Sequence, residues 1–211
     1  NGWLPSPDYR VWWGYEDEKL FEFAKVRLNE LGNGQQPFNF TMLTVDTHFE
    51  DGYPCRLCQD LYGEQYANVM ACSSRQLVEF IRWIQQQPFY ENTTIVLVGD
   101  HLTMDSDFCA NVSPEYQRGV LNIFVNAPVM AVNTKNRIAS TMDMFPTTIA
   151  ALGGEIEGDR LGLGTNLFSG RPTLAEELGM DQLNAEVRKN SLFYAGLAGG
   201  MEVDDSVMDM K

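Results

Sequence analysis

A run of apolar and β-branched residues at positions 93–98 constrains the fold of this chain more than any other stretch. It carries no charge and no alternation of polar and apolar residues, which is typical of a strand covered on both faces in a parallel sheet. Gly99 allows the chain to turn, and Asp100 and His101 follow it. Because open α/β sheets bind ligands at the carboxyl ends of their strands, we expect an α/β fold with a metal-binding pair at Asp100 and His101.

A second candidate strand, at positions 38–45, also ends in an acid and a histidine, Asp46 and His48. The chain has only two histidines, so both of them follow a predicted strand. Two plainer interpretations stay open. His48 could simply hydrogen-bond its own loop, and Asp100 could cap a turn that leaves His101 as an ordinary surface residue.

The remaining pattern alternates helices and strands. Apolar spacing predicts a long helix at 16–31 that ends at a Gly-Asn-Gly turn, and a helix at 75–87 capped by Ser73 or Ser74. With the strands on either side, the second helix forms a predicted βαβ unit. Further elements are expected as a strand at 120–125, helices at 142–152 and 174–178, and loops at 49–72, 102–118 and 159–170.

Charge and composition exclude several classes of partner. The chain has 211 residues, 44% hydrophobic content and a net charge of −14. Phosphates would be repelled by this charge, so we expect no nucleic acid and no anionic membrane surface as a partner. No apolar run approaches the length of a membrane-spanning helix, and the first residue is Asn1, so we interpret the chain as part of a longer protein.

The four cysteines are Cys55, Cys58, Cys72 and Cys109. Zinc knuckles need two close cysteine pairs or a cysteine pair with a histidine pair, and only one CxxC is present. Disulfides in an oxidising, extracytoplasmic compartment are the favoured interpretation, with reduced cysteines in the cytosol as the alternative. Pairing of Cys58 with Cys72 would fix the loop before a helix, and Cys55 with Cys109 is the remaining combination.

Several motifs in a fixed order carry a family resemblance. The sequence resembles the sulfatase-like branch of the alkaline phosphatase superfamily, in particular lipoteichoic acid synthases and the phosphoglycerol transferases of periplasmic glucans. The residues at 44–48 and the positions of Cys58 and Cys72 favour the glucan-type enzymes. The resemblance covers residues 13 to 169, and its motifs are TVDTH at 44–48, VGDH at 98–101, MDMFPTT at 142–148, LGLG at 161–164 and NLFSG at 166–170.

This resemblance implies an extracytoplasmic domain on a membrane anchor, with a mostly parallel sheet flanked by helices. It implies a divalent metal, commonly manganese, with magnesium, zinc or calcium as alternatives. Asp100 and His101 match the Asp-His pair that helps to hold this metal. In the family the metal polarises a phosphoryl oxygen and activates a threonine nucleophile.

The same resemblance implies a substrate and several contacts to it. The donor is phosphatidylglycerol or another phosphate or sulfate ester, and the acceptor is a glycan or polyol of the cell envelope. His48 matches the histidine that contacts the phosphoglycerol substrate in lipoteichoic acid synthases. Asp46, Asp51 and Tyr53 lie beside it in sequence and are candidates for positioning a glycerol or sugar acceptor.

Two residues that the family needs have no match in this chain. The nucleophilic threonine and the first metal-binding acid fall before the region that aligns, so we expect the chain alone to be inactive and its sheet to be incomplete at the N-terminal side. The expected organisation is one catalytic part at 1–199 and an acidic tail at 200–211. Trp3, Trp12 and Trp13 are candidates for an exposed surface.

Two other functions remain open on the sequence. A sulfatase or phosphodiesterase would share the ligands and pass its group to water. A non-catalytic extracellular binding domain would keep Asp100 and His101 as remnants and recognise a glycan or polyol through the loops at 49–72 and 102–118.

Overall fold

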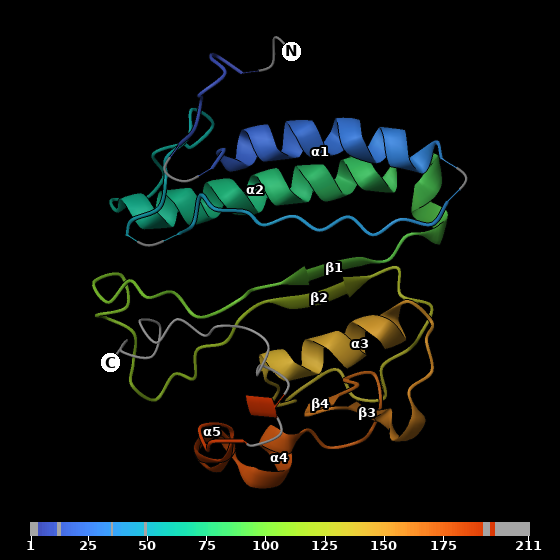
Figure 1. The fold of residues 1–211 in the computed structure, drawn as a ribbon. Coiled ribbons are helices and arrows are strands. Elements are labelled where there is room, and N and C mark those ends of the chain that lie inside the picture. Colours follow the sequence, from blue (N-terminus) through green and yellow to red (C-terminus); the bar gives the residue numbers. More distant parts are fainter. Residues whose placement is uncertain (1–3, 12–13, 35, 49, 192–194, 197–211) are drawn as a thin grey trace. The chain divides into compact units, whose positions relative to one another are not determined.

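The computed structural model describes the chain as two compact units, residues 1–126 and 127–211, each considered by itself (Figure 1). Three of the expected features, at Trp3, at Trp12 and Trp13, and in the tail at 200–211, lie outside the described residues. No helix in the described part is long and apolar enough to cross a membrane. The described residues are 4–11, 14–34, 36–48, 50–191 and 195–196.

The first unit is built on two long helices, α1 (Asp17–Gly32) and α2 (Gln65–Gln85), which pack against each other. The helix predicted at 16–31 is confirmed. The second helix begins ten residues before its predicted start at 75, so the expected loop at 49–72 is shorter. Glu64 caps α2 by accepting the amides of the next turn, and Ser73 instead donates to Asp17 Oδ2 at 3.1 Å.

A small apolar core holds the two helices together. The rings of Phe21 and Phe80 lie 4.8 Å apart between centroids, and both side chains are buried. Burial of each such side chain contributes roughly 1.5–3 kcal/mol. The buried members of this core are Phe21, Ala24, Leu28, Phe80 and Ile84.

The strand predicted at 38–45 is wrong for the described structure, because this stretch is extended but belongs to no sheet. Its side chains do alternate: Phe38, Phe40 and Met42 pack against the core, whereas Leu43 is 73% exposed. Figure 1 shows the stretch running along α2. No partner strand lies beside it in the described residues, so the period-2 pattern is satisfied by packing without a hydrogen-bonded ladder.

The strands predicted at 93–98 and 120–125 form an antiparallel pair. After the short 3-10 helix η1 (Pro88–Asn92), β1 (Ile95–Val98) pairs with β2 (Asn122–Val125), with Ile95 opposite Val125. Both strands fall where they were predicted. The parallel sheet is not shown, since every strand pair in the described residues is antiparallel, and Val98 is 42% exposed where burial on both faces was expected.

The second unit begins with a capped helix. A 3-10 turn, η2 (Thr141–Asp143), leads into α3 (Met144–Ala151), close to the predicted helix at 142–152. The cap is Ser140, whose hydroxyl and amide both bond the Asp143 carboxylate. Asp143 also accepts the Thr165 amide at 2.7 Å, which fixes the Gly-rich loop to this helix.

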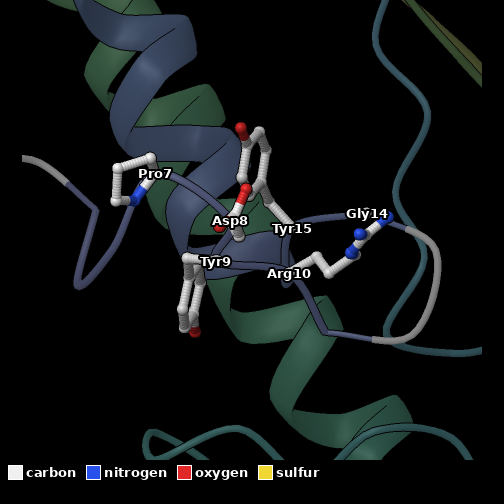
Figure 2. A pocket seen from close by; sticks show the side chains of 6 residues that line it. All are labelled: Pro7, Asp8, Tyr9, Arg10, Gly14 and Tyr15. Carbon is white, nitrogen blue, oxygen red and sulfur yellow. The ribbon is translucent and has the colours of Figure 1, made fainter.

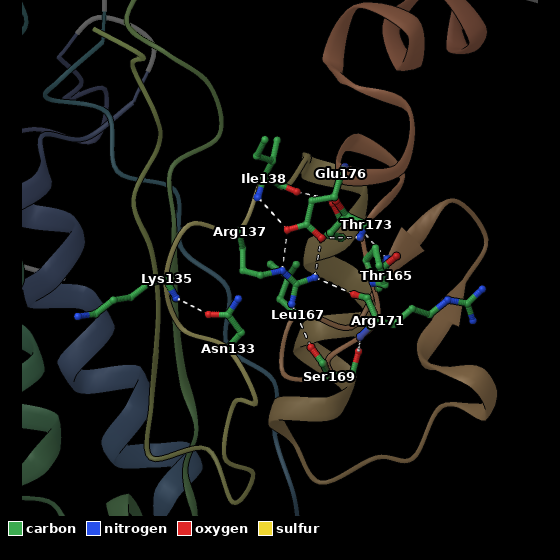
Figure 3. A network of polar contacts seen from close by, with 12 residues as sticks. Asn133, Lys135, Arg137, Ile138, Thr165, Leu167, Ser169, Arg171, Thr173 and Glu176 are labelled. Atoms are coloured by element: carbon green, nitrogen blue, oxygen red, sulfur yellow. Dashed lines mark hydrogen bonds and ion pairs between the residues drawn. The ribbon is translucent and has the colours of Figure 1, made fainter.

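A polar network completes the second unit (Figure 3). Arg137 bonds both carboxylate oxygens of Glu176 and the backbone carbonyls of Ser169 and Arg171. Thr173 caps the helix that was expected at 174–178, in a reciprocal capping box with Glu176. The other elements of the second unit are η3 (Glu157–Asp159), β3 (Arg160–Leu161), β4 (Gly164–Thr165), α4 (Leu174–Leu178) and the unpredicted α5 (Met180–Val187).

Candidate functional site

The loop that carries His48 is closed on itself by backbone hydrogen bonds. The His48 amide donates to Val45 O at 2.9 Å, and the Tyr53 amide donates to Asp46 O at 2.7 Å. Gly52 makes the closure possible, since its φ is +66° and a Cβ there would lie 2.6 Å from Asp46 O. These backbone bonds hold the two ends of the loop that carries His48 together.

Asp46 lies beneath this loop and bonds the start of α1. Its Oδ1 accepts the Asp17 amide at 3.0 Å, while Asp17 Oδ1 accepts the amides of Val45 at 2.7 Å and Asp46 at 3.2 Å. Both carboxylates are buried, and Asp46 Oδ2 has no hydrogen-bond partner among the described residues. Burial, with the charge of Asp17 beside it, raises the pKa of Asp46 to about 7.

Asp51 and Tyr53 differ in exposure. Asp51 is exposed and adopts a positive φ of 57°, and its amide donates to Asp105 Oδ2 at 3.4 Å. Tyr53 is half-buried, and burial together with the negative charge of Glu16 raises the pKa of its phenol. The role of both residues in acceptor positioning stays a prediction.

Asp100 and His101 follow β1 and are exposed. The Gly99 amide donates to Leu121 O at 2.8 Å, so the β1–β2 ladder continues to the residue before the pair. His101 Nε2 lies 3.6 Å from Asp100 Oδ2, and His101 Nδ1 lies 2.8 Å from Leu102 O. A proton on Nδ1, donated to that carbonyl, leaves the lone pair of Nε2 available to a metal.

These two side chains fit part of a divalent-metal site. An imidazole nitrogen and a carboxylate oxygen are donor types that manganese and zinc accept. Among the residues that the structure describes, no third carboxylate, thiol or imidazole joins Asp100 and His101. The pair alone therefore offers fewer ligands than such ions take.

Two hydrogen-bonded residues hold the His48 loop and the His101 loop together. The buried Tyr66 hydroxyl on α2 bonds Thr47 O at 2.9 Å and Thr103 Oγ1 at 2.8 Å. The buried Asp105 accepts the Asp51 amide and, through Oδ1, the Phe108 amide at 2.9 Å. Tyr66 and Asp105 therefore connect the two histidine-bearing loops within the first unit.

The sequence did not predict the structural roles of Asp17, Tyr66 and Asp105. An acid in the first turn of a helix is common, so nothing in the sequence indicated that Asp17 bonds the backbone before the His48 loop. Tyr66 fell in a stretch that was taken for a loop. Asp105 falls in the loop expected at 102–118, and its burial had no signal in the sequence.

The cysteines divide into a group of three and one apart. Cys55 Sγ lies 3.8 Å from Cys58 Sγ and 3.9 Å from Cys72 Sγ, and all four cysteines are free thiols in the structure. Cys109 Sγ instead bonds Arg118 Nη1 at 3.1 Å. The disulfides Cys58–Cys72 and Cys55–Cys109 stay predictions.

One hollow of about 410 Å³ lies on the lead-in to α1 (Figure 2). None of its lining residues was predicted to bind substrate or metal. Tyr9 at its edge donates to Glu16 at 2.8 Å, and this bond raises the pKa of the Tyr9 phenol to about 12. The lining residues are Pro7, Asp8, Tyr9, Arg10, Gly14 and Tyr15.

Comparison with known proteins identifies the class to which this site belongs. The profile of the sulfatase family matches residues 2–154, which is more than half of the chain. The chain belongs to the sulfatase family, within the alkaline phosphatase superfamily, as its motifs indicated. Members of this superfamily generally use a divalent metal, which agrees with the donor types of Asp100 and His101.

Two relatives to which the chain is similar are both named phosphoglycerol transferase I. The chain is 32% identical over 174 residues to phosphoglycerol transferase I of Citrobacter koseri, covering 80% of this chain and 22% of that protein. It is 32% identical over 177 residues to phosphoglycerol transferase I of Escherichia fergusonii, covering 81% and 23%. The chain thus spans less than a quarter of the length of these relatives. No solved structure showed a significant match.

Proposed function

We propose that this chain is part of the catalytic domain of a metal-dependent phosphoglycerol transferase. The reaction moves glycerophosphate from phosphatidylglycerol to a glycan or polymer of the cell envelope. The observation that carries the proposal is the 32% identity to proteins named phosphoglycerol transferase I across 80% of this chain. The whole protein would be anchored in the membrane and act on its extracytoplasmic face.

The described residues supply two parts of the proposed site. Asp100 and His101 would contribute two ligands to a divalent ion, for which manganese is the first candidate. Such an ion supplies Lewis-acid stabilisation of phosphoryl oxygens. His48, on its closed loop, would contact the phosphoglycerol group, with Asp51 and Tyr53 beside the acceptor.

Asp46 has a different place in this proposal. Its carboxylate is buried and bonded to the Asp17 amide, so its contribution to substrate binding is to fix the loop that carries His48. Tyr66 and Asp105 act in the same way on the His101 loop. None of these three residues needs to touch substrate for its loss to affect the reaction.

The chain alone is proposed to be inactive, because the family resemblance matches no nucleophile within it. The test therefore uses the full-length protein with phosphatidylglycerol, manganese and a periplasmic-type glucan as acceptor. Labelled glycerophosphate on the glucan supports the transferase. Free glycerophosphate formed equally with and without the glucan would instead establish a hydrolase.

Inertness toward this lipid and toward aryl sulfate and phosphodiester substrates would overturn the enzymatic proposal. A glycan-binding measurement on the same preparation would then test the non-catalytic alternative. The isolated chain serves as a second sample in each assay, and turnover by it would contradict the proposal that it is inactive.

A further inference from the structure

Three cysteine sulfurs from two separate parts of the chain meet at one point. Cys55 and Cys58 lie in the loop after the His48 turn, and Cys72 lies on α2. Their Sγ atoms all lie within 4.8 Å of one another, and two of the separations are 3.8 and 3.9 Å. Thiolates bound at about 2.3 Å to a tetrahedral ion lie roughly 3.8 Å apart.

We propose that Cys55, Cys58 and Cys72 bind one thiophilic metal ion of the zinc class. The sequence alone argued against zinc because it shows a single CxxC. Folding supplies the third thiol, Cys72, from the first part of α2, and this part was expected to be loop. This site is separate from Asp100 and His101, and it does not depend on the proposed transferase activity.

Two side chains place nitrogen donors beside the sulfurs. Gln76 Nε2 lies 3.6 Å from Cys55 Sγ and 3.5 Å from Cys72 Sγ. Arg75 Nη2 lies 3.6 Å from Cys72 Sγ, so its positive charge can offset the net negative charge of an ion with three thiolates. Nitrogen donors of this kind orient metal-binding groups and stabilise them in their charged form.

The local backbone also resembles a metal-binding turn. The Cys58 amide donates to Cys55 O at 3.0 Å, which folds the CxxC into a tight turn. Cys55 and Cys72 are 5% and 1% exposed, whereas Cys58 is half-buried and forms the accessible side. No fourth thiol, imidazole or carboxylate joins the group in the part of the chain described, so water would complete the coordination.

A metal ion accounts for all three sulfurs, whereas a disulfide would use only two and leave a thiol crowded against it. Binding exchanges the thiol protons for the metal: one divalent ion and three thiols give a complex of charge −1 and three released protons.

An ion here would have a structural effect on the candidate site. Tyr53 lies two residues before Cys55, in the same loop as His48, and Cys72 belongs to the helix that also carries Tyr66. The ion would therefore fix the far end of the substrate loop to α2. Its removal is expected to loosen that loop while the helix core stays intact.

The test is a cobalt titration of the full 211-residue chain, purified with reductant and freed of metal by a chelator. Cobalt bound by thiolates gives a charge-transfer absorption whose intensity grows with the number of sulfur ligands. We expect one cobalt per chain with the intensity of three thiolates, and displacement of the cobalt by one equivalent of zinc. Elemental analysis of the zinc form gives the same stoichiometry.

Cys72→Ser and the less buried Cys58→Ser should both lose this absorption, and Cys109→Ser, which alters the cysteine outside the group, should keep it. Circular dichroism checks that each variant is folded. If a variant does not fold, the intensity for the unaltered chain still counts its thiolates. Absence of cobalt absorption in that chain overturns the proposal, as does an equal loss in Cys109→Ser. Peptide mapping without reductant that finds a disulfide between two of the three cysteines in metal-replete protein also overturns it.

Discussion

At the scale of single residues, the buried Asp46 carboxylate controls how the His48 loop is held. It accepts the Asp17 amide through one oxygen, and its other oxygen has no partner in the part of the chain that the structure describes. Because its pKa rises to about 7 in the folded chain, the folded state holds a proton that the unfolded state has already released above its own pKa of ~3.9. This group therefore lowers stability as the pH rises from about 4 to 7.

Asp46→Asn should remove this contribution, since its amide oxygen can still accept the Asp17 amide without charge. The variant should match the unaltered chain near pH 4 and exceed its unfolding free energy by on the order of 1–3 kcal/mol at pH 8. Denaturant unfolding at several pH values measures the difference. Asp51→Asn, an exposed position of the same loop, is the matched control and should not change how the unfolding free energy depends on pH. This account would be contradicted if the unfolding free energy of Asp46→Asn fell with rising pH as steeply as that of the unaltered chain.

The Tyr66 hydroxyl is a second residue with a defined role, because it bonds both histidine-bearing loops. Tyr66→Phe should retain the edge-to-face contact with Phe108, where the ring centroids lie 5.0 Å apart. Loss of the two hydrogen bonds, at about 0.5–1.5 kcal/mol each, should cost about 1–3 kcal/mol. Hydrogen exchange should become faster in both loops and stay unchanged in α1.

The control for this change is Tyr62→Phe, whose side chain is 52% exposed. It should alter neither stability nor exchange. Unchanged exchange of both loops in Tyr66→Phe would show that the hydroxyl does not hold them together.

At the scale of elements, the ion pair of Arg137 and Glu176 connects the segment before α3 to α4. Arg137 lowers the pKa of Glu176, and both side chains are largely buried, at 13% and 21% exposure. A carboxylate with a lowered folded pKa contributes stability above its unfolded pKa of ~4.3 and loses it as the pH falls through the folded value.

Glu176→Gln should therefore destabilise the second unit by roughly 1–3 kcal/mol at neutral pH, with the difference shrinking below about pH 4. Glu186→Gln is the control, because it removes an exposed pair with Lys189 and should cost no more than about 0.5 kcal/mol. Chemical denaturation followed by signals from α4 measures both. Equal losses in the two variants would contradict the role of the Arg137 network.

Most helices were predictable from the sequence and sheet pairing was not. Apolar spacing located α1, and α3 and α4 lie close to their expected ranges, because helix signals are local in the chain. The early start of α2 and the whole of α5 were not predicted. The pattern at 38–45 was also correct for side chains, since Phe38 and Phe40 face the core. A ladder requires a partner strand, which depends on distant parts of the chain, so the parallel pairing could not be read from the pattern.

At the scale of the whole molecule, the sequence predicted an acid and a histidine after each of two strands. Asp100 and His101 do follow β1, whereas His48 follows an extended stretch that belongs to no sheet. Hydrogen bonds of Tyr66 connect the two histidine-bearing loops. The buried residues that make this connection, and the meeting of three cysteines, arise only after folding. The expected single catalytic part at 1–199 stays a prediction beside the two compact units at 1–126 and 127–211.

The central claim is that Asp100 and His101 serve a phosphoglycerol transferase. The most direct measurement compares transfer of labelled glycerophosphate from phosphatidylglycerol to glucan by the full-length protein, with manganese, for the unaltered enzyme, His101→Ala and Asp107→Asn. Asp107 is an exposed acid of the same loop and serves as the control. Loss of a metal ligand should lower turnover by at least ~100-fold in His101→Ala, and Asp107→Asn should stay active. Equal turnover in all three proteins would contradict the account.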